Sequence, residues 1–281
     1  MNERKTIEKQ IYKYSIYLKN DEKSKNTIEK YIRDIRAFFK FIDNSSLVKK
    51  SVIEYKNKLI SLGYASRSIN SMLASINGFF SFIGRPELKV KTIKLQRQIY
   101  CPEEKELTKN EYIKLLNTAV KSGNLRLNLL IETICATGIR VSELKYITLE
   151  AVRQGVAVVS LKDKTRTVFI VRKLQKKLLR YAAKQNIKTG SIFITRNGKP
   201  MNRSNIWREM KKLCDQAGVN AKKVFPHNLR HLFARVFYSL ERDIVKLADI
   251  LGHSNINTTR IYIVSDGNEH RKKLENMRLI M

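Results

Sequence analysis

The chain has 281 residues, 43% of them hydrophobic, which is enough for one large or two ordinary globular domains. Its 56 lysines and arginines against 25 aspartates and glutamates give a net charge of +31, which favours a polyanionic partner such as nucleic acid over a merely solvated surface. The three cysteines are isolated and odd in number, so neither a disulfide framework nor a zinc site is expected, and no apolar run is long enough to cross a bilayer.

The first part of the chain is predicted to be a basic helical bundle. Apolar residues recur at helical spacing over residues 28–42 and 69–83, and weaker patterns of the same kind cover residues 6–19 and 51–62. Short amphipathic helices of this kind bury their apolar faces against one another, while lysines and arginines cover the outer faces. We therefore expect a helical, DNA-binding first domain over residues 1–88.

A linker is predicted next. Helical periodicity fades over residues 89–104 while positive charge persists, which fits a connector that follows phosphates between two domains, although a surface strand would look similar. Thr108 followed by Glu111 then forms a capping box that opens a new helix. We expect the second domain to begin there and to cover residues 105–265.

The second domain changes from helical to strand periodicity in its middle. Two β-branched runs at residues 155–161 and 166–171 are joined by a polar turn and predict a hairpin, and residues 191–195 predict an edge strand. Helical patterns then return at residues 204–217, 227–239 and 243–251. The predicted fold is mainly α with a small antiparallel β-sheet.

Five residues in three motifs are the candidates for catalysis. Arg140 lies in ATGIRVSEL, His227 and Arg230 lie in PHNLRHLFA, and His253 and Tyr262 lie in LGHSNINTTRIYI. Guanidinium groups bind phosphate oxygens in a planar fork, histidines carry protons, and a hydroxyl can act as a nucleophile. This set suits attack on a phosphodiester without a metal or other cofactor, because neighbouring cations would stabilise a phenolate and the pentacoordinate phosphorus.

Helical spacing refines the roles of these residues. His227 and Arg230 are three residues apart, so on a helix they share a face and can reach one phosphate together. His231 points about 100° away from Arg230 and is predicted to be either a packing residue or a residue that supports the catalytic side chains from behind. Thr258 and Thr259 are candidates to cap the short helix before Tyr262.

In their order and spacing, these motifs resemble those of the tyrosine recombinases, the lambda-integrase and Xer group, over roughly residues 105–265. The helical first domain is similar to the SAM-like core-binding domain of that family. The resemblance implies that His253 donates a hydrogen bond to the phosphate. It also implies a hairpin lysine that protonates the departing sugar oxygen, for which Lys162 is our choice and Lys164 the alternative. The resemblance further implies that the tail, residues 266–281, forms a basic helix that docks on a neighbouring subunit, with packing in cis left open.

The implied reaction is site-specific DNA recombination. Tyr262 attacks a phosphodiester, forms a 3′-phosphotyrosyl link and releases a 5′-hydroxyl, and a hydroxyl from a partner strand reverses the step. The implied partners are double-stranded DNA and further copies of the chain, as a tetramer in the synapse. An accessory DNA-bending or directionality protein is left open. With a charged N-terminus unlike a secretory signal, we expect a cytoplasmic, nucleoid-associated protein with no membrane partner.

Two other readings compete with recombination. A non-catalytic DNA-binding or architectural relative would keep the charge but would not need the whole catalytic set, and a type IB topoisomerase-like enzyme would relax DNA without exchanging partners. Within recombination, the sequence fits a simple two-domain enzyme. Both a Xer-like resolver of chromosome or plasmid dimers and a compact mobile-element integrase remain open.

Overall fold

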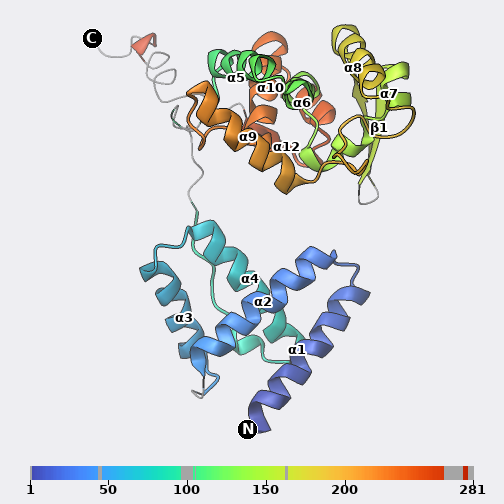
Figure 1. Cartoon of the computed structure of the whole chain (residues 1–281). Helices are drawn as coiled ribbons and strands as arrows, with labels where there is room; N and C mark the ends of the chain where they lie inside the picture. Colours follow the sequence, from blue (N-terminus) through green and yellow to red (C-terminus); the bar gives the residue numbers. More distant parts are fainter. Residues whose placement is uncertain are drawn as a thin grey trace. The chain divides into compact units, whose positions relative to one another are not determined.

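The chain divides into two compact units, Met1–Arg97 and Gln98–Met281. The computed structural model, drawn in Figure 1, describes residues 2–43, 46–95, 104, 106–161, 164–262 and 275–277. Lys162 and nearly all of the predicted tail helix lie outside these residues, as does the side chain of Lys164. Among the residues described, no helix is long and apolar enough to span a membrane.

The first unit is helical where it is described, at the four places that the periodicity predicts. Its elements are α1 (Asn2–Asn20), α2 (Lys25–Ile42), α3 (Lys49–Ser61), α4 (Ser66–Phe82) and a 3-10 turn, η1 (Pro86–Leu88). Ser24 caps α2, since its hydroxyl accepts the amide of Thr27. The apolar faces of α2 and α4 meet in an aromatic core in which Phe38, Phe79 and Phe80 are fully buried.

The chain after η1 is fixed to α4 rather than running clear of the first unit. The side chain of Asn77 both donates to and accepts from the backbone of Val90, at 2.9 and 3.2 Å, and Asn70 pairs in the same way with Ile93, at 2.8 Å for both bonds. Asn70 and Asn77 are seven residues apart on a helix, and Val90 and Ile93 are three residues apart in an extended segment. Both separations are about 10 Å, so the two pairs of hydrogen bonds can form together. Residues 90–93, near the start of the predicted linker, are thus bound to the first unit.

The second unit is mainly helical in its described part, with one antiparallel hairpin. Its elements are α5 (Lys109–Lys121), α6 (Leu125–Thr137), η3 (Val141–Tyr146), α7 (Leu149–Gln154), β1 (Val156–Leu161), β2 (Lys164–Phe169), α8 (Arg172–Lys184), α9 (Arg203–Ala217), α10 (Pro226–Glu241), α11 (Ile244–Leu251) and α12 (Ile256–Arg260). The predicted capping box of Thr108 and Glu111 opens α5. The predicted hairpin is confirmed, with Val156 opposite Phe169 and Leu161 opposite Lys164.

One predicted strand is wrong. Within the described residues the sheet consists of β1 and β2, and residues 191–195 make only isolated bridges, such as Thr148 to Ser191. Ile192 and Phe193 are neighbours in sequence and both are buried. Because successive side chains of a strand point to opposite faces, a surface edge strand would not bury both. This segment fills the core as an irregular connection.

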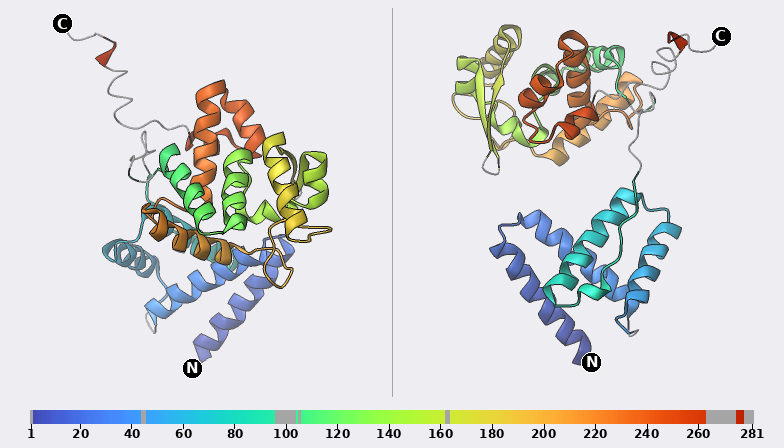
Figure 2. Two further views of the ribbon diagram at one scale, coloured as in Figure 1. Left: turned by 45° about the horizontal axis from the view of Figure 1, so that its top comes forward. Right: turned by 180° about the vertical axis from the view of Figure 1, so that it is seen from behind.

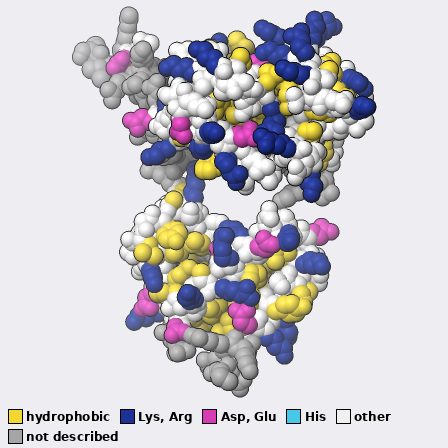
Figure 3. All heavy atoms as spheres, viewed as in Figure 1, with side chains coloured by type: hydrophobic (Ala, Val, Ile, Leu, Met, Phe, Trp, Pro, Cys, Tyr) yellow, Lys and Arg dark blue, Asp and Glu magenta, His cyan; other side chains and the backbone are white. Residues whose placement is uncertain are grey.

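The arrangement of helices brings the candidate motifs to one region of the second unit. α10 packs against α6, and α11 contacts α10, α12 and β2. The views in Figure 2 show α10 and α11 (orange to red) beside α6 (green). Figure 3 shows lysine and arginine side chains spread over the visible surface of each unit, as expected from the charge.

Candidate active site

Arg230 lies at the centre of the site. It projects from the second turn of α10, and only 1% of the residue is exposed. Its Nη1 donates to the carbonyl of Gly138, its Nη2 donates to the carbonyl of Leu251 at 2.7 Å, and the same Nη2 lies 2.9 Å from Nε2 of His253. Helix ends leave backbone carbonyls without partners, and the two-nitrogen fork of arginine satisfies two of them here.

Arg140 follows the end of α6. Gly138 ends that helix with a φ of 62°, and Arg140 then caps η3. Its Nη1 donates to Glu143 at 2.8 Å and its Nη2 lies 3.5 Å from the carbonyl of Gly252, yet 38% of the side chain is exposed. The salt bridge therefore leaves part of the guanidinium accessible to a ligand.

Glu143 is a buried carboxylate that holds two arginines. It accepts the backbone amide and the guanidinium of Arg140, and it accepts Nη2 of Arg166 at 2.6 Å. Burial by itself would raise the pKa of this carboxyl, but these hydrogen bonds and the charge of Arg166 hold the pKa below its usual value. Glu143 is therefore charged at neutral pH and balances part of the local positive charge.

Arg166 belongs to the site although it lies in none of the three sequence motifs. This residue lies on β2 with 11% of its side chain exposed, and it also donates to the carbonyl of Ile250 at 2.6 Å. The sequence contains a signal for its inward position, because Arg166 alternates with the apolar residues Val168 and Ile170, which are buried, and alternate residues of a strand face the same side.

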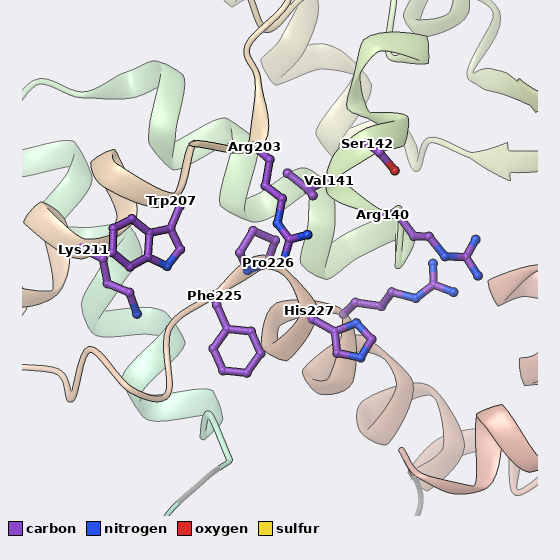
Figure 4. Close-up of a pocket in the computed structure, with 10 residues that line it drawn as sticks. Arg140, Val141, Ser142, Arg203, Trp207, Lys211, Phe225, Pro226 and His227 are labelled. Atoms are coloured by element: carbon purple, nitrogen blue, oxygen red, sulfur yellow. The ribbon is translucent and has the colours of Figure 1, made fainter. Parts of the chain in front are cut away.

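A pocket opens beside the arginines. It is lined by Arg140, Val141, Ser142, Arg203, Trp207, Lys211, Phe225, Pro226, His227 and Arg230, shown in Figure 4. Arg203, which likewise lies in none of the three sequence motifs, enters from the first turn of α9. Partial burial, then the charges of Arg230, Arg140 and Arg203, lower the pKa of His227. The pocket is therefore a cationic site of a size to receive part of a polyanion.

Tyr262 is packed among histidine rings. It follows α12 and is 3% exposed. Its ring centroid lies 5.7 Å from that of His227, 4.3 Å from that of His231 and 5.5 Å from that of His253, whose ring is nearly parallel to it. The ring of His231 therefore packs against the side chain of the candidate nucleophile.

The predicted cap of α12 is wrong. Asn255 is the N-cap, since its side chain accepts the amide of Asn257, whereas Thr258 and Thr259 lie inside the helix. Asn255 precedes the helix with extended backbone, which is the conformation that a cap needs. The hydroxyl of Thr259 instead lies 2.9 Å from Nδ1 of His253.

Both ring nitrogens of His253 are therefore occupied. Because Nη2 of Arg230 can only donate, Nε2 of His253 accepts and carries no proton, and Nδ1 holds the proton that it donates to Thr259. Burial, followed by the charges of Arg230 and Arg140, lowers the pKa of His253 to about 4. In this arrangement His253 is a neutral acceptor that buttresses Arg230.

The structure thus gathers five of the six predicted site residues, Arg140, His227, Arg230, His253 and Tyr262. The sixth, Lys162, lies outside the described residues.

Burial and the charge of Arg140 lower the pKa of Arg230 to about 10, against a smaller opposing effect of Tyr262. Arg230 therefore stays cationic at neutral pH.

The histidines predict that mild acid destabilises the fold. Burial is the main cause that lowers the pKa of His231 to about 3 and of His253 to about 4. Below about pH 6.5 these histidines are protonated in the unfolded chain but stay neutral in the folded chain. Their contribution to the free energy of unfolding is therefore complete above this pH and is lost as the pH falls towards 4. The loss can reach about 1.4 kcal/mol for each unit of pKa difference between the two states.

Urea unfolding between about pH 7.5 and about pH 5 measures this loss. His231→Gln, which cannot be protonated, is expected to flatten the pH dependence of the unfolding free energy. An unchanged slope in this variant would contradict the assignment of His231 as a buried neutral histidine.

Comparison with known proteins identifies the family. The profile of the phage integrase family matches residues 105–269, and that of the phage integrase N-terminal SAM-like domain matches residues 11–86. The chain is 30% identical to the tyrosine recombinase XerA of Pyrococcus horikoshii, over 96% of this chain and 94% of that protein. It is 29% identical to the tyrosine recombinase XerD of Staphylococcus saprophyticus, over 89% of this chain and 91% of that protein.

The fold is also similar to solved structures. A lambda integrase tetramer bound to a Holliday junction matches with a TM-score of 0.73 at 17% identity, over 91% of this chain and 76% of that chain. The integrase profile covers more than half of this chain, and the relative from Pyrococcus aligns along almost all of it. With its SAM-like N-terminal domain and its integrase catalytic domain, the chain belongs to the phage integrase family and is a Xer-like tyrosine recombinase, an enzyme that cuts and rejoins DNA.

Proposed function

We propose that Arg140, His227, Arg230, His253 and Tyr262 form one active site that cleaves a DNA strand through a 3′-phosphotyrosyl intermediate. One observation supports this most. The buried guanidinium of Arg230 is held beside both His253 and the ring of Tyr262, and the same guanidinium lines the pocket with Arg140 and His227. A phosphate in this pocket would meet Arg140 and Arg230 of this set, close to Tyr262, which carries the only hydroxyl among the five.

The chemistry is a transesterification. The oxygen of Tyr262 forms a bond to phosphorus and loses its proton, the bond from phosphorus to the 5′-oxygen breaks, and a proton passes to that oxygen. Arg140 and Arg230 stabilise the added negative charge. The lysine of the hairpin turn, for which we keep Lys162, gives its proton to the departing oxygen, and His227 donates to the phosphate. A 5′-hydroxyl from another strand then attacks the phosphotyrosine and restores the phenol.

His253 acts in a more specific way than the sequence suggests. With Nε2 accepting from Arg230, it orients the guanidinium that holds the phosphate. To donate to phosphate itself, the ring would have to release Arg230 or Thr259. We therefore propose that His253 positions Arg230 before DNA binds and exchanges one of these partners when a phosphate enters.

A nicked suicide duplex tests the proposal. Cleavage near the nick releases a short oligonucleotide by diffusion, so the covalent complex cannot be resealed. We expect wild-type protein to form an adduct that survives SDS, with a protein on the 3′ end of the strand and the modified peptide containing Tyr262. If no adduct forms on any duplex that the protein binds specifically, or if the protein is attached through another residue, the proposed mechanism is wrong.

A topoisomerase-like reaction is distinguished by the products. We propose that the enzyme joins strands from two duplexes, because the relatives reported above are recombinases. Two labelled duplexes of different length would then give recombinant products. A topoisomerase would relax supercoiled DNA and reseal each strand to its original partner, without such products.

We propose that both units hold the duplex, with residues 1–88 as the core-binding domain, 89–104 as the connection, of which residues 90–93 are bound to the first unit, and 105–265 as the catalytic domain. Self-association on DNA would follow the pattern of the lambda integrase tetramer on its Holliday junction. The tail would then dock on a neighbouring copy, since Leu274 and Met277 give it an apolar side.

Deletion of residues 267–281 tests the role of the tail. We expect it to weaken cooperative assembly on a two-site duplex more than binding to a single site, because the apolar face would no longer reach a partner. Gel-shift titrations of one-site and two-site duplexes give both quantities from the same preparations. Equal cooperativity for the full and the truncated chain would refute docking in trans.

A further inference from the structure

Three arginines converge on the last turn of α11. Arg166 Nη1 donates to the carbonyl of Ile250 at 2.6 Å, Arg230 Nη2 donates to that of Leu251 at 2.7 Å, and Arg140 Nη2 lies 3.5 Å from that of Gly252. Carbonyls at the end of a helix lack partners within it and carry the negative end of its dipole. This turn therefore offsets the repulsion among the three guanidinium groups.

Arg166 connects this turn to the rest of the site. Its other terminal nitrogen binds Glu143, the carboxylate that also holds the backbone amide and the guanidinium of Arg140. A continuous path of hydrogen bonds thus runs from β2 through Arg166 and Glu143 to Arg140, with a branch to α11. Lysine has one terminal nitrogen and cannot reproduce this bridge in the same geometry.

The position of Gly252 provides separate evidence that Arg166 packs against the end of α11. Its φ is 65°, and a Cβ atom added there would lie 2.3 Å from Cδ of Arg166. The stem of Arg166 therefore lies directly across Gly252, and its far end cannot swing away without breaking the bonds to Ile250 and Glu143. Any side chain at this position would displace the arginine.

We propose that Arg166 is a positioning residue for strand cleavage: it holds the β1–β2 hairpin, the end of α11 and the Arg140–Glu143 pair together as one unit. Arg166 acts through Arg140 and through the turn that leads to His253, and it does not bind the phosphate itself. Lys164 is the first residue of β2, two residues before Arg166, so the bridge also holds the strand that follows the turn of the hairpin. This inference rests on the proposed function.

Arg166→Lys tests the bridge, and Arg126→Lys is a matched control. Arg126 also bridges a backbone carbonyl and a glutamate, because it donates to Ile194 at 2.9 Å and to Glu209 at 2.7 Å, and it belongs to the same unit but not to the site. Single-turnover cleavage of the suicide duplex is measured at saturating enzyme, and DNA affinity is measured separately by gel shift.

We expect Arg166→Lys to slow cleavage about 10- to 100-fold, as misplaced catalytic groups do, while the Kd for DNA changes by less than about threefold. Arg126→Lys should cleave at the wild-type rate. Wild-type cleavage by Arg166→Lys, or an equal loss in both variants, would overturn the inference. The outcome is distinct from failure of the proposed function, in which the wild-type protein itself would form no adduct through Tyr262.

The pH profile separates positioning from a general loss of stability. The charged and titratable groups that face Arg166 are Glu143 and Arg140 at η3, Arg230 on α10 and His253 after α11. Its positive charge helps to lower the pKa of both His253 and Glu143. Arg166→Gln should therefore move the acidic limb of the cleavage rate to higher pH, whereas Arg126→Gln should leave it in place. An unmoved limb in Arg166→Gln would count against the inference.

A pair of glycine variants keeps the test decisive if the arginine variants fold poorly. Gly252→Ala displaces Arg166, whereas Gly218→Ala meets nothing within 4 Å. Both residues end a helix with a similar φ, 65° and 61°, so the backbone strain is matched. We expect only Gly252→Ala to slow cleavage, by about tenfold or more. Equal rates for the two variants would refute the role of Arg166.

Discussion

Tyr262→Phe is expected to abolish the SDS-resistant adduct while DNA binding remains. Phenylalanine can fill the same space between the rings of His227, His231 and His253, so the fold should tolerate the change. The hydroxyl that forms the phosphotyrosine bond is removed, and the cleavage rate should fall by about 10⁴-fold or more, the scale seen when a covalent nucleophile is deleted. Suicide-substrate assays and gel shifts on the same preparation measure the two effects.

Tyr238→Phe is the matched control for this experiment. Tyr238 packs against the same small apolar cluster as Tyr262, on α10, and has no proposed part in the reaction. It should cleave like the wild type. An adduct that persists in Tyr262→Phe would show that another side chain attacks the phosphate.

Arg230→Lys should have the second largest effect. Arg230 uses separate nitrogens to bind the carbonyls of Gly138 and Leu251, and a lysine would leave at least one of these buried groups without its partner. We expect a loss of about 1 to 3 kcal/mol in unfolding free energy from this, and a loss of about 10²- to 10³-fold in cleavage rate from the weaker grip on the transition state.

Arg235→Lys separates the two losses. Arg235 lies on the same helix and binds Glu106 and the carbonyl of Leu107, so its replacement breaks a partly buried pairing at a residue that does not line the pocket. Thermal melts should show a comparable destabilisation for the two variants, with cleavage lost only in Arg230→Lys. Equal cleavage rates for both would mean that Arg230 is structural.

Local patterns predicted much of the fold. The helical spacing of residues 28–42 and 69–83, the capping box at Thr108 and the β-branched runs of the hairpin are encoded within a few residues each, and the structure forms an element at each of these places. α6 was harder to see, because residues such as Leu129 and Ile131 are buried on several sides and the helix has no polar face to give a period.

Contacts between distant segments could not be predicted in the same way. The bridge from Arg166 to Glu143 joins residues 23 apart and its bond to Ile250 joins residues 84 apart. Nothing in the local spacing selects these partners. The neutral state of His253 also depends on a distant residue, because the Arg230 that binds it comes from another helix. The three motifs named five candidate residues that the structure brings together, whereas Arg166, Arg203 and the hydrogen-bond partners became evident only in the folded arrangement.

The two asparagines on α4 shorten the connection between the units. Since Asn70 and Asn77 fix the chain as far as Ile93, and Arg235 binds it again at Glu106, the twelve residues 94–105 lie between the last of these anchors on the first unit and the first on the second. At about 3.5 Å for each step along the chain, the Cα atoms of Ile93 and Glu106 can be no more than about 45 Å apart. If both units bind one duplex, as proposed above, binding of one unit holds the other at high effective concentration near the DNA. We therefore expect Asn70 and Asn77 to influence DNA affinity, although they belong to the unit that contains none of the candidate catalytic residues.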